Sequence, residues 1–543
     1  MNKLKRTAAL LMAAGLSLSM LAGCGTPGQD STSASPNAEQ NTTEGAAEGY
    51  TYKIATVRWN DTWPTDFLTD GVMGDLAEEA DIDIEWQIYY SNDFGEQKAL
   101  LFASDDLPDA FFGSCGLGDS DIVQNKEKLL ELTDLINEET MPNLMKIFEE
   151  DPTMRMACTD RNGQIYSLPK KIPFRPKLNT QNYINKEWLD NLNLEMPTNY
   201  DELKEVLIAF KEQDADGDGD PNNEIPLSCY KPGYGSAFAL LDSFDLIERG
   251  DEHMALDANN KVVFVPAQDH YKEAVKYYRE LWELGVMDEE FFTQDQAMYT
   301  AKLQKEGGSQ IGIFSGWTAD SWAGANTKQF VQMPTLESPW GTKNAQSIVS
   351  TEYSDKELIL NINCPDPEKV LRWADLFYDD LVSLQTFYGS ISTGQIKDNG
   401  DGTYELLTPE DNTLDTSAWM YSPRDFGPKY MRKEFEEKVT LPTDQGDGLK
   451  LAEDALNAQY VDNPDLLHAW PGTIKFTDDE INERTTLNVD INSYVEAQWA
   501  HWITEGGVEE EWDDYLQQLD AMGLQRLIEI DQGAYDAYVE MMG

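Results

Sequence analysis

Two stretches near the start of the chain decide its fold: YKIATVRW at residues 52–59 and IDIEWQIY at residues 82–89. The first is a run of β-branched and aromatic residues, and in the second apolar and polar residues alternate, so both predict β-strands. Residues 66–80 (DFLTDGVMGDLAEEA) lie between them and have helical character. A strand–helix–strand unit implies parallel strands, so the sequence predicts an α/β fold.

The same alternation continues along the chain. Residues 94–113 (FGEQKALLFASDDLPDAFFG) predict a helix, a proline break and a short strand, which makes the first lobe doubly wound. Apolar spacing behind Thr198 and the Asp366-Pro367 pair each predict a further helix. IGIFSG at residues 311–316 predicts another strand, and the pattern from Asn482 onward is mostly helical.

The composition indicates a large folded protein with an acidic surface. A chain of 543 residues exceeds one compact core, so two or more lobes are expected. Hydrophobic residues make up 41% and aromatic residues 11%, which is too much apolar mass for a disordered chain. Against 41 Lys and Arg stand 99 Asp and Glu, a formal net charge of -58. Such a surface repels phosphate backbones, which excludes nucleic acid as a partner.

The N-terminus carries an export signal. Residues 1–23 (MNKLKRTAALLMAAGLSLSMLAG) place positive charges ahead of a short apolar stretch that ends in small residues. The string Leu21-Ala22-Gly23-Cys24 resembles the lipobox of bacterial lipoproteins. That resemblance implies that residues 1–23 are a lipoprotein signal peptide and that Cys24 is lipidated. A plain secretory signal with a chance cysteine is the alternative.

Residues 24–49 predict a flexible tether behind the lipid, because they hold no aromatic or large aliphatic residue. No later stretch approaches the run of about 18 apolar residues that a membrane span needs. We therefore expect a lipid-anchored protein on the extracellular face of the cell membrane of a Gram-positive bacterium.

Motifs for enzymatic chemistry are missing from the sequence. It contains no G-x-S-x-G, phosphate-binding loop, H-E-x-x-H or dinucleotide-binding glycine pattern after a strand. Carboxylate pairs are inevitable among 99 acidic residues and indicate no glycosidase by themselves. We expect buried thiols with a structural role at four positions, and the sequence does not decide whether any of them form disulfides: Cys115, Cys158, Cys229 and Cys364. We expect no enzyme; a secreted glycosidase or lyase and a structural or adhesive lipoprotein are the less favoured alternatives.

Several short strings together resemble one protein family. In order they are LPDAF (107–111), GQIYSLP (163–169), YINKEWLD (183–190) before MPT (196–198), DADGDGDPNNEIP (214–226), YYREL (277–281), WDDY (512–515) and AYD (534–536). No single string is specific. Their order and spacing, together with the lipobox, are similar to those of the extracellular solute-binding proteins of carbohydrate ABC importers (family 1-like), the branch that includes alginate-binding proteins.

The resemblance implies a two-lobed α/β fold of the periplasmic-binding-protein type (type II), with a hinge of several crossings and a helical C-terminal segment. Lobe 1 would comprise residues 50–170 and about 345–420, and lobe 2 about 171–344 and 421–543. Lobes of this kind close over a ligand. The implied function is that of a monomer that captures an oligosaccharide and delivers it to ABC permease subunits, and the alternative ligand is a peptide or another small solute.

Aromatic residues in predicted loops are candidates for sugar contact, because a sugar presents an apolar C–H face beside its hydroxyl groups. Trp59 and Trp63 follow the first strand, and Trp317 follows the strand at residues 311–316. Ligands of open α/β sheets lie at such carboxyl ends of strands. We predict sugar contact by these three tryptophans, with packing in the core or between the lobes as the alternative.

The predicted polar neighbours of these rings are Asp61, Asp320 and Arg424, for which simple solvation is the alternative. A basic cluster consists of Lys170, Lys171, Arg175 and Lys177. It is either a local patch for an anionic sugar or, as we favour, a salt-bridged crossing segment. Without such a patch, the acidic surface disfavours a highly anionic oligouronide.

The acidic loop at residues 214–226 predicts a structural calcium site. Aspartates occupy positions 1, 3 and 5 of an EF-hand-like loop, and Gly219 allows the tight turn at position 6. Position 12 is Ile225, so Glu224 has to supply the last carboxylate. The expected ligands are Asp214, Asp216, Asp218, Asp220, Asn222 or Asn223, and Glu224. The resemblance to alginate-binding proteins, whose similar loop binds calcium, supports this assignment, and a disordered acidic turn is the alternative.

Overall fold

The structure is a computed structural model that describes residues 49–104, 106–114, 116–230, 239–247, 253–347, 352–409, 414–461 and 463–542. The predicted signal peptide, Cys24, nearly all of the tether, and Cys115 lie outside the described residues. Among the described helices, none combines the length and the apolar character that crossing a bilayer would require.

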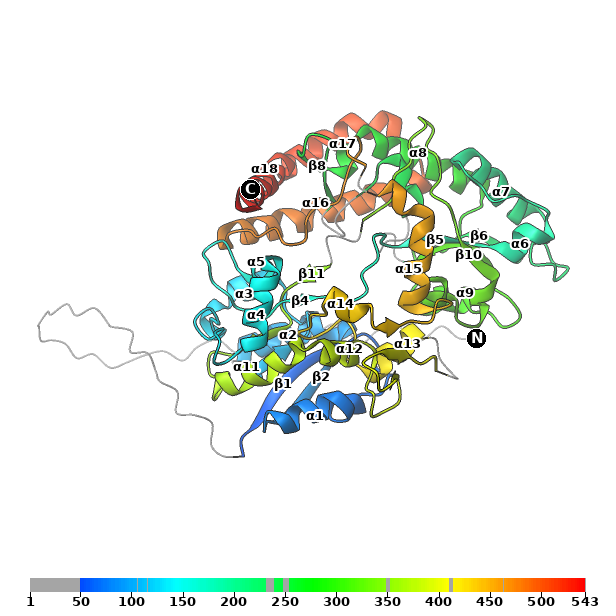
Figure 1. Cartoon of the computed structure of the whole chain (residues 1–543). Helices are drawn as coiled ribbons and strands as arrows, with labels where there is room; N and C mark the ends of the chain where they lie inside the picture. Colours follow the sequence, from blue (N-terminus) through cyan, green and yellow to red (C-terminus); the bar gives the residue numbers. More distant parts are fainter. Residues whose placement is uncertain are drawn as a thin grey trace, which may run out of the picture. The chain divides into compact units, whose positions relative to one another are not determined.

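The first sheet contains the strands predicted from the start of the chain (Figure 1). Its strand order is β12–β3–β1–β2. The parallel strands are β1 (Thr51–Arg58), β2 (Asp83–Tyr90) and β3 (Ala110–Phe112), and β12 (Leu358–Leu360) is antiparallel to β3. Helices α1 (Gly71–Glu79) and α2 (Ser91–Ser104) connect the parallel strands, which confirms the predicted strand–helix–strand unit.

Buried side chains pack on one face of this sheet against α4 (Pro142–Glu150) and α11 (Pro367–Asp375). Ile54, Leu144 and Trp373 are fully buried in this core. The helix predicted at Asp366-Pro367 is therefore present, and the Asp366 side chain caps it by accepting from the Lys369 amide at 3.2 Å.

The second sheet is mixed, with the order β10–β5–β9–β6. Its strands are β5 (Gln181–Asn185), β6 (Ile225–Leu227), β9 (Ile311–Gly316) and β10 (Phe330–Gln332). β9 is the strand predicted from IGIFSG, and it pairs antiparallel with β5 and parallel with β6. Its Gly312 admits no larger residue, because a Cβ there would lie 2.7 Å from the Phe210 ring.

The helix predicted behind Thr198 is α7 (Tyr200–Glu212), with one correction at its start. Its N-cap is Asn199, whose side chain accepts from the Glu202 amide at 2.9 Å. Thr198 instead donates its hydroxyl to the Glu202 carboxylate at 2.8 Å. The capping signal was thus displaced by one residue, because Asn caps a helix as well as Thr does.

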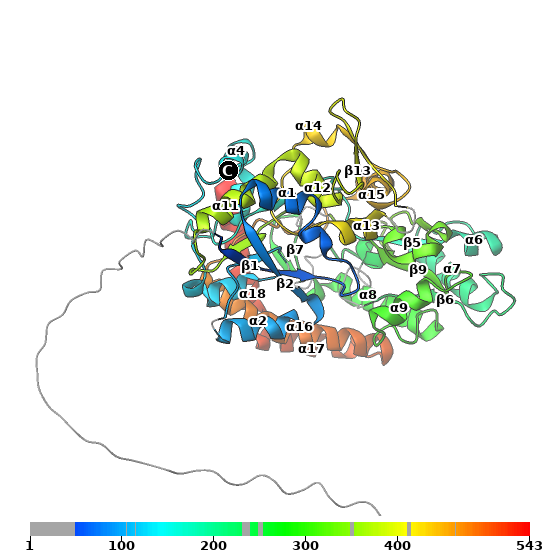
Figure 2. The ribbon, with the colours of Figure 1, turned by 90° about the horizontal axis from the view of Figure 1, so that it is seen from below.

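The C-terminal segment is helical, as predicted. α16 (Asp478–Thr504), α17 (Val508–Met522) and α18 (Leu524–Met542) pack together and on α8 (Asp269–Leu284), and Figure 2 shows the same segment from below. The start of α16 contacts α3 (Asp119–Gln124) near an ion pair between Lys126 and Asp478 at 2.7 Å.

A third core lies between α12 (Asp380–Tyr388), α13 (Leu414–Tyr421) and a small sheet of β13 (Ile396–Asp398), β14 (Tyr404–Leu406) and β15 (Val439–Thr440). Three crossings join the first and third cores to the core of the second sheet. Their described residues are 172–183, then 336–347 and 352–358, and finally 441–461 and 463–467. Short pairings join these crossings, as between β4 (Lys170–Lys171) and β11 (Tyr353–Ser354) and between Leu178 and Ser347.

Candidate functional site

Four aromatic rings gather where β1 and β3 end. Trp59 directly follows β1, and its ring lies 5.7 Å from the ring of Phe426. Trp419, in α13, lies 5.4 Å from Phe426 and 6.3 Å from Trp63. We call Trp59, Trp63, Trp419 and Phe426 the aromatic cluster. Because Phe426 is buried while Trp59 is 48% exposed, the cluster presents an apolar surface to solvent.

The end of β1 fixes one side of this cluster. Arg58 is the last residue of β1 and is 2% exposed. Its guanidinium donates to the carbonyl oxygen of Trp419 and, at 3.5 Å, to that of Ser422. It also lies over the Phe67 ring, 4.8 Å from the centroid. A buried cation therefore ties the end of α13 to the end of β1.

Two glycines allow the other side of the cluster to approach β3. Gly113 follows β3 with a φ of 99°, and a Cβ there would lie 3.0 Å from the Cβ of Phe426. Gly427 has a φ of 83°, and its Cβ would lie 2.1 Å from the Phe112 ring. Only glycine satisfies both the backbone conformation and the close contact at these positions.

Trp317 lies in a second group that contains two cations. The guanidinium of Arg175 lies over its ring at 5.5 Å, and the ammonium of Lys450 at 4.8 Å, as cation–π contacts. Burial lowers the pKa of Lys450 to about 8, and its Nζ donates to the Asn179 carbonyl at 2.6 Å. Burial also lowers the pKa of Arg175, and nearby Asp425 opposes this shift, so the second group borders the loop that carries Phe426.

The three predicted polar neighbours occupy different environments. Asp61 is exposed. Arg424 is 4% exposed and forms an ion pair with Asp447 at 2.8 Å. Asp320 is also 4% exposed, its Oδ2 accepts from the Gly446 amide at 2.9 Å, and burial raises its pKa. Arg424 and Asp320 thus hold the first residues of α15 (Gly446–Asn457).

The basic cluster is ion-paired at its first two residues. Lys170 pairs with Glu357 at 2.8 Å, and Lys171 lies 3.5 Å from Glu352 and 3.7 Å from Asp151. These contacts agree with the favoured interpretation of a salt-bridged crossing segment, and β4, which both residues form, pairs with β11 of another crossing.

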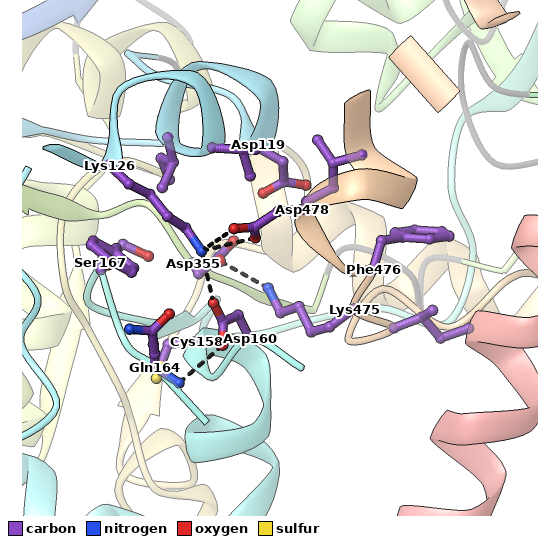
Figure 3. Close-up of a pocket in the computed structure, with 15 residues that line it drawn as sticks. Asp119, Lys126, Cys158, Asp160, Gln164, Ser167, Asp355, Lys475, Phe476 and Asp478 are labelled. Atoms are coloured by element: carbon purple, nitrogen blue, oxygen red, sulfur yellow. Dashed lines mark hydrogen bonds and ion pairs between the residues drawn. The ribbon is translucent and has the colours of Figure 1, made fainter. Parts of the chain in front are cut away.

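A cavity of about 60 Å³ lies elsewhere, beside the start of α16 (Figure 3). In it Lys126 pairs with Asp478 at 2.7 Å and with Asp160 at 3.2 Å, and Lys475 pairs with Asp355 at 2.8 Å. This volume holds a few water molecules. None of the predicted sugar-contact residues lines it. We interpret it as an ion-paired junction between α16 and the first lobe.

The acidic loop brings three carboxylates close together. One carboxylate oxygen each from Asp214, Asp216 and Asp218 lie within 4.8 Å of one another. Asp216 and Asp218 accept from the amides of Asp218 and Asp220 at 3.0 and 2.8 Å, so successive Asx turns curl the loop. Burial raises the pKa of Asp216, to which the neighbouring carboxylates of Asp218 and Asp214 add.

Three buried oxygens of this loop have no hydrogen-bond donor: Asp214 Oδ1, Asn223 Oδ1 and Glu224 Oε2. A buried acceptor without a partner is costly, and a cation would supply the missing partner. The all-oxygen donor set suits calcium. Both asparagines left open by the sequence donate their amide groups within the loop, Asn222 to Asp220 at 2.9 Å and Asn223 to Asp218 at 2.8 Å. Asn222 is exposed, whereas the Asn223 oxygen is buried without a partner, so Asn223 is the better candidate ligand.

Three cysteines can be compared with their predicted role. Cys158, Cys229 and Cys364 are buried, and burial raises the pKa of the Cys158 and Cys364 thiols to about 12. Thiols of such high pKa are unreactive, which agrees with a structural role.

Sequence reasoning missed Phe426 and Arg58 as parts of the site. The only local signal was the S-P-R-D-F-G-P string at residues 422–428, whose Pro and Gly residues indicate a sharp turn. Nothing in that string indicates that it packs on the end of β3.

Comparison with known proteins identifies the family, although no family model matches the sequence. The chain is 30% identical over 550 residues to the fructooligosaccharide ABC transporter substrate-binding protein FusA of Streptococcus pneumoniae, with 98% of each chain covered. The structure of S. pneumoniae FusA in complex with kestose has a TM-score of 0.80 at 28% identity and covers 90% of this chain and 100% of that one. An HMO-binding solute-binding protein of Bifidobacterium longum infantis has a TM-score of 0.76 at 25% identity, covering 90% and 99%.

Two further structures concern the acidic loop and the predicted family. An EF-hand mutant of S. pneumoniae FusA with fructo-nystose has a TM-score of 0.80 at 27% identity. The alginate-binding protein AlgQ2, in a structure without calcium ion, shares the fold with a TM-score of 0.66 at 19% identity. The relatives are binding proteins of transporters, so the predicted fold class and the prediction of a non-enzymatic binding protein are confirmed. This chain belongs to the extracellular solute-binding proteins of family 1 and is a substrate-binding protein of a carbohydrate ABC transporter.

Proposed function

We propose that the protein captures a neutral oligosaccharide of the fructooligosaccharide class on the aromatic cluster and delivers it to its ABC permease. The observation that carries this proposal is the half-exposed ring of Trp59, backed by the buried ring of Phe426 at the carboxyl end of β1. Such a plate suits the apolar face of a sugar. The FusA relative, which is named for fructooligosaccharides, supports the ligand class.

We assign different roles to the predicted residues. Trp59 and Trp63 stack on the sugar, and the exposed Asp61 between them in sequence accepts from sugar hydroxyls. Trp317 approaches from the second group, where Arg175 and Lys450 hold its ring. Asp320 and Arg424 act beneath the site, through Gly446 and Asp447 of α15.

The preference for a neutral ligand follows from charge. The formal net charge of the chain is -58, and the Lys170 and Lys171 cations are occupied by Glu357, Glu352 and Asp151. The acidic surface would therefore repel an anionic oligouronide, and these two ion-paired lysines would not provide a compensating positive patch. A neutral fructan carries no such cost.

The experiment is a thermal-shift screen of the mature protein, followed by calorimetry. Kestose and nystose are the expected ligands, and an oligogalacturonide and a tripeptide are the comparison set. A ligand at a hundredfold its dissociation constant adds about 2.7 kcal/mol to the free energy of unfolding. Stabilisation by the fructans alone, with the sugars recovered intact, supports the proposal, and stabilisation by the oligouronide or peptide alone overturns it.

The remaining proposals concern location and organisation. We place the protein on the outer face of the membrane through a lipid on Cys24, as a monomer that contacts the permease. We propose the first two predicted lobe boundaries unchanged and move the last from residues 420/421 to the third crossing, because residues 431–441 pack in the third core with α12 and α13. We also assign a structural calcium ion to the acidic loop. The three unpaired buried oxygens of that loop support the calcium assignment.

A further inference from the structure

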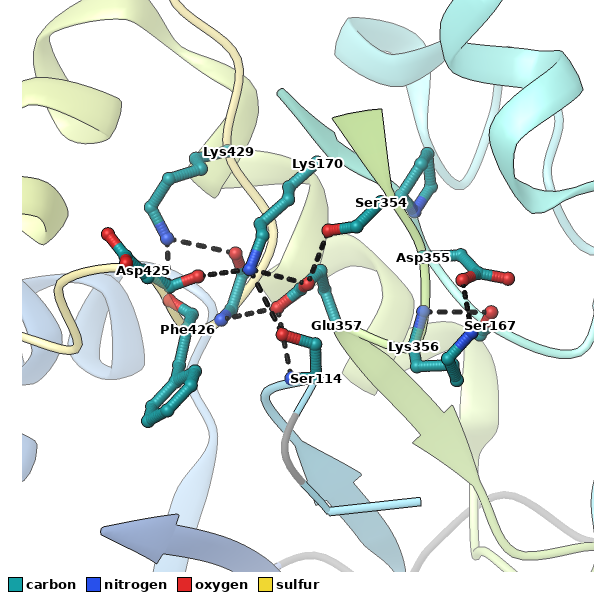
Figure 4. A network of polar contacts seen from close by, with 12 residues as sticks. Ser114, Ser167, Lys170, Ser354, Asp355, Lys356, Glu357, Asp425, Phe426 and Lys429 are labelled. Atoms are coloured by element: carbon teal, nitrogen blue, oxygen red, sulfur yellow. Dashed lines mark hydrogen bonds and ion pairs between the residues drawn. The ribbon is translucent and has the colours of Figure 1, made fainter. Parts of the chain in front are cut away.

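Lys429 lies against the loop at residues 425–427 and binds its backbone (Figure 4). Its side chain is fully buried. Nζ donates to the carbonyl oxygen of Phe426 at 2.5 Å and to that of Gly427 at 2.9 Å. One side chain therefore fixes two consecutive peptide units, including the one that carries the ring at the centre of the aromatic cluster.

Glu357 fastens the same loop to the end of β3. It is fully buried, and its Oε2 accepts from the Gly427 amide at 2.9 Å and from the Ser114 amide at 3.2 Å. Its other oxygen pairs at 2.8 Å with Lys170, which is 3% exposed. Lys170 in turn donates to the Asp425 carbonyl and, at 3.0 Å, to the Ser114 hydroxyl.

Burying three charged side chains costs desolvation free energy, and well-packed apolar residues in their place are often at least as stabilising. Unlike apolar side chains, these three charged side chains can form hydrogen bonds that fix the orientation of the backbone groups of the loop. Four hydrogen bonds from this set reach residues 425–427, and each ends on a backbone carbonyl or amide. The result is a fixed Phe426 ring, 5.7 Å from Trp59 and 5.4 Å from Trp419.

We propose that Lys429 and Glu357 are positioning residues for sugar binding: they fix the loop at residues 425–427 so that Phe426 holds the Trp59 ring in its binding orientation. Neither side chain touches the sugar, because both are fully buried. This inference rests on the proposed role of the aromatic cluster in sugar capture.

The charge of Lys429 offers a second readout. Burial and, next, the neighbouring Lys170 lower its pKa to about 7, Glu357 and Asp425 oppose this shift, and Arg424 adds to it. The amine therefore changes charge near neutral pH. Both charge states can donate to the two carbonyls, but the charged state does so more strongly.

The test is a double-mutant cycle on kestose binding, measured by calorimetry. Lys429→Met and Phe426→Ala should each weaken binding about fivefold or more. If Lys429 acts through Phe426, the double variant binds no more weakly than Phe426→Ala alone. Glu357→Gln is the second variant and should follow Lys429→Met. The control is Lys397→Met, which should keep wild-type affinity. The Lys397 side chain is 54% exposed and forms an ion pair with Glu405 at 2.8 Å.

Multiplied losses in the double variant, or wild-type affinity in Lys429→Met, overturn the inference. If the wild-type protein binds no oligosaccharide of the panel, the proposed function fails instead. In that case the near-ultraviolet circular dichroism spectrum of the ligand-free protein tests whether Lys429 positions Phe426, because the spectrum reports the packing of the tryptophan rings. A Lys429→Met spectrum that matches Phe426→Ala supports the positioning role, and a wild-type spectrum contradicts it.

Discussion

The guanidinium of Arg58 donates to the backbone carbonyl of Trp419 across 361 positions of the sequence. The contact joins the last residue of β1 to the helix that carries one ring of the aromatic cluster. Arg58 is 2% exposed, and its guanidinium takes the carbonyls of Trp419 and Ser422 as hydrogen-bond partners in place of bulk water. The proposed sugar site thus lies at the end of a strand, where ligands of α/β sheets bind.

Replacing Arg58 by methionine should destabilise the protein and loosen the cluster. The carbonyls of Trp419 and Ser422 lose their donor, which predicts a loss of about 2 to 4 kcal/mol in the free energy of unfolding by urea denaturation. The matched control is Arg372→Met, since this arginine is 46% exposed and pairs with Glu368 at 3.2 Å within one helix. It should change stability by about 0.5 kcal/mol or less. Equal effects of the two variants would contradict the structural role of Arg58.

Replacing Trp59 by alanine should weaken sugar binding without unfolding the protein. The ring is 48% exposed, so its loss costs little core packing. A tryptophan anchor in a binding site predicts a loss of about 1 to 2 kcal/mol in the binding free energy of kestose. Trp340→Ala is the control, because Trp340 is 38% exposed but stacks on His270 at 4.3 Å, outside the aromatic cluster. If both variants bind kestose like the wild type, the sugar contacts lie elsewhere.

The stability of the protein should rise with pH above neutrality through Lys429. Its pKa is lowered from 10.5 to about 7 by burial and then by Lys170. Between these values the unfolded chain holds a proton that the folded protein lacks, so the free energy of unfolding rises with pH in this window. Lys429→Met should flatten the rise measured by urea denaturation between about pH 7.5 and about pH 9, while Lys397→Met should keep it. An unchanged slope in Lys429→Met would refute the lowered pKa.

Local patterns were enough to predict the elements, and they were not enough to predict their contacts. β1, β2 and β9 follow from runs of β-branched and aromatic residues, because strand formation and burial depend on the same side chains. Trp59 and Trp63 were predicted to contact sugar because they follow the first strand, and they remain candidates in the proposed site. The strings that resemble the solute-binding family added the two-lobed form of the α/β fold.

Contacts over long sequence separations could not be predicted. Arg424 resembled a sugar ligand in sequence, yet it pairs with Asp447 in the structure, and only the folded chain brings α15 to it. The burial of Lys429 is invisible for the same reason. A lysine in a polar, proline-rich stretch normally faces solvent, whereas Lys429 points inward and donates to the carbonyls of Phe426 and Gly427.

Lipidation should depend on Cys24. The Leu-Ala-Gly-Cys string predicts that a tagged fatty acid labels the wild-type protein and that Cys24→Ala loses the label and releases the protein to the medium. Cys158→Ala removes a buried thiol and should keep the label. Label retained in Cys24→Ala would exclude the lipid anchor at this residue.

Removal of calcium should lower the melting temperature while kestose binding persists. Without the ion, the carboxylates of Asp214, Asp216 and Asp218 repel one another within 4.8 Å, and Glu224 Oε2 keeps no partner. A chelator should therefore shift the melting curve of the wild-type protein to lower temperature, and added calcium should restore it.

The control for this experiment is a second acidic turn of the chain. Asp401 accepts from the Thr403 amide at 3.0 Å in the hairpin between β13 and β14, so Asp401→Asn should respond to the chelator like the wild type. Asp214→Asn should melt at the lower temperature already and respond no further. The loop would be a plain acidic turn if elemental analysis found no calcium in the wild-type protein and the chelator left its melting curve unmoved. In the part of the chain that the structure describes, no hydrogen bond, ion pair or ring contact joins the acidic loop to the aromatic cluster, so kestose affinity should survive chelation. A loss of kestose affinity would contradict the purely structural role of the ion.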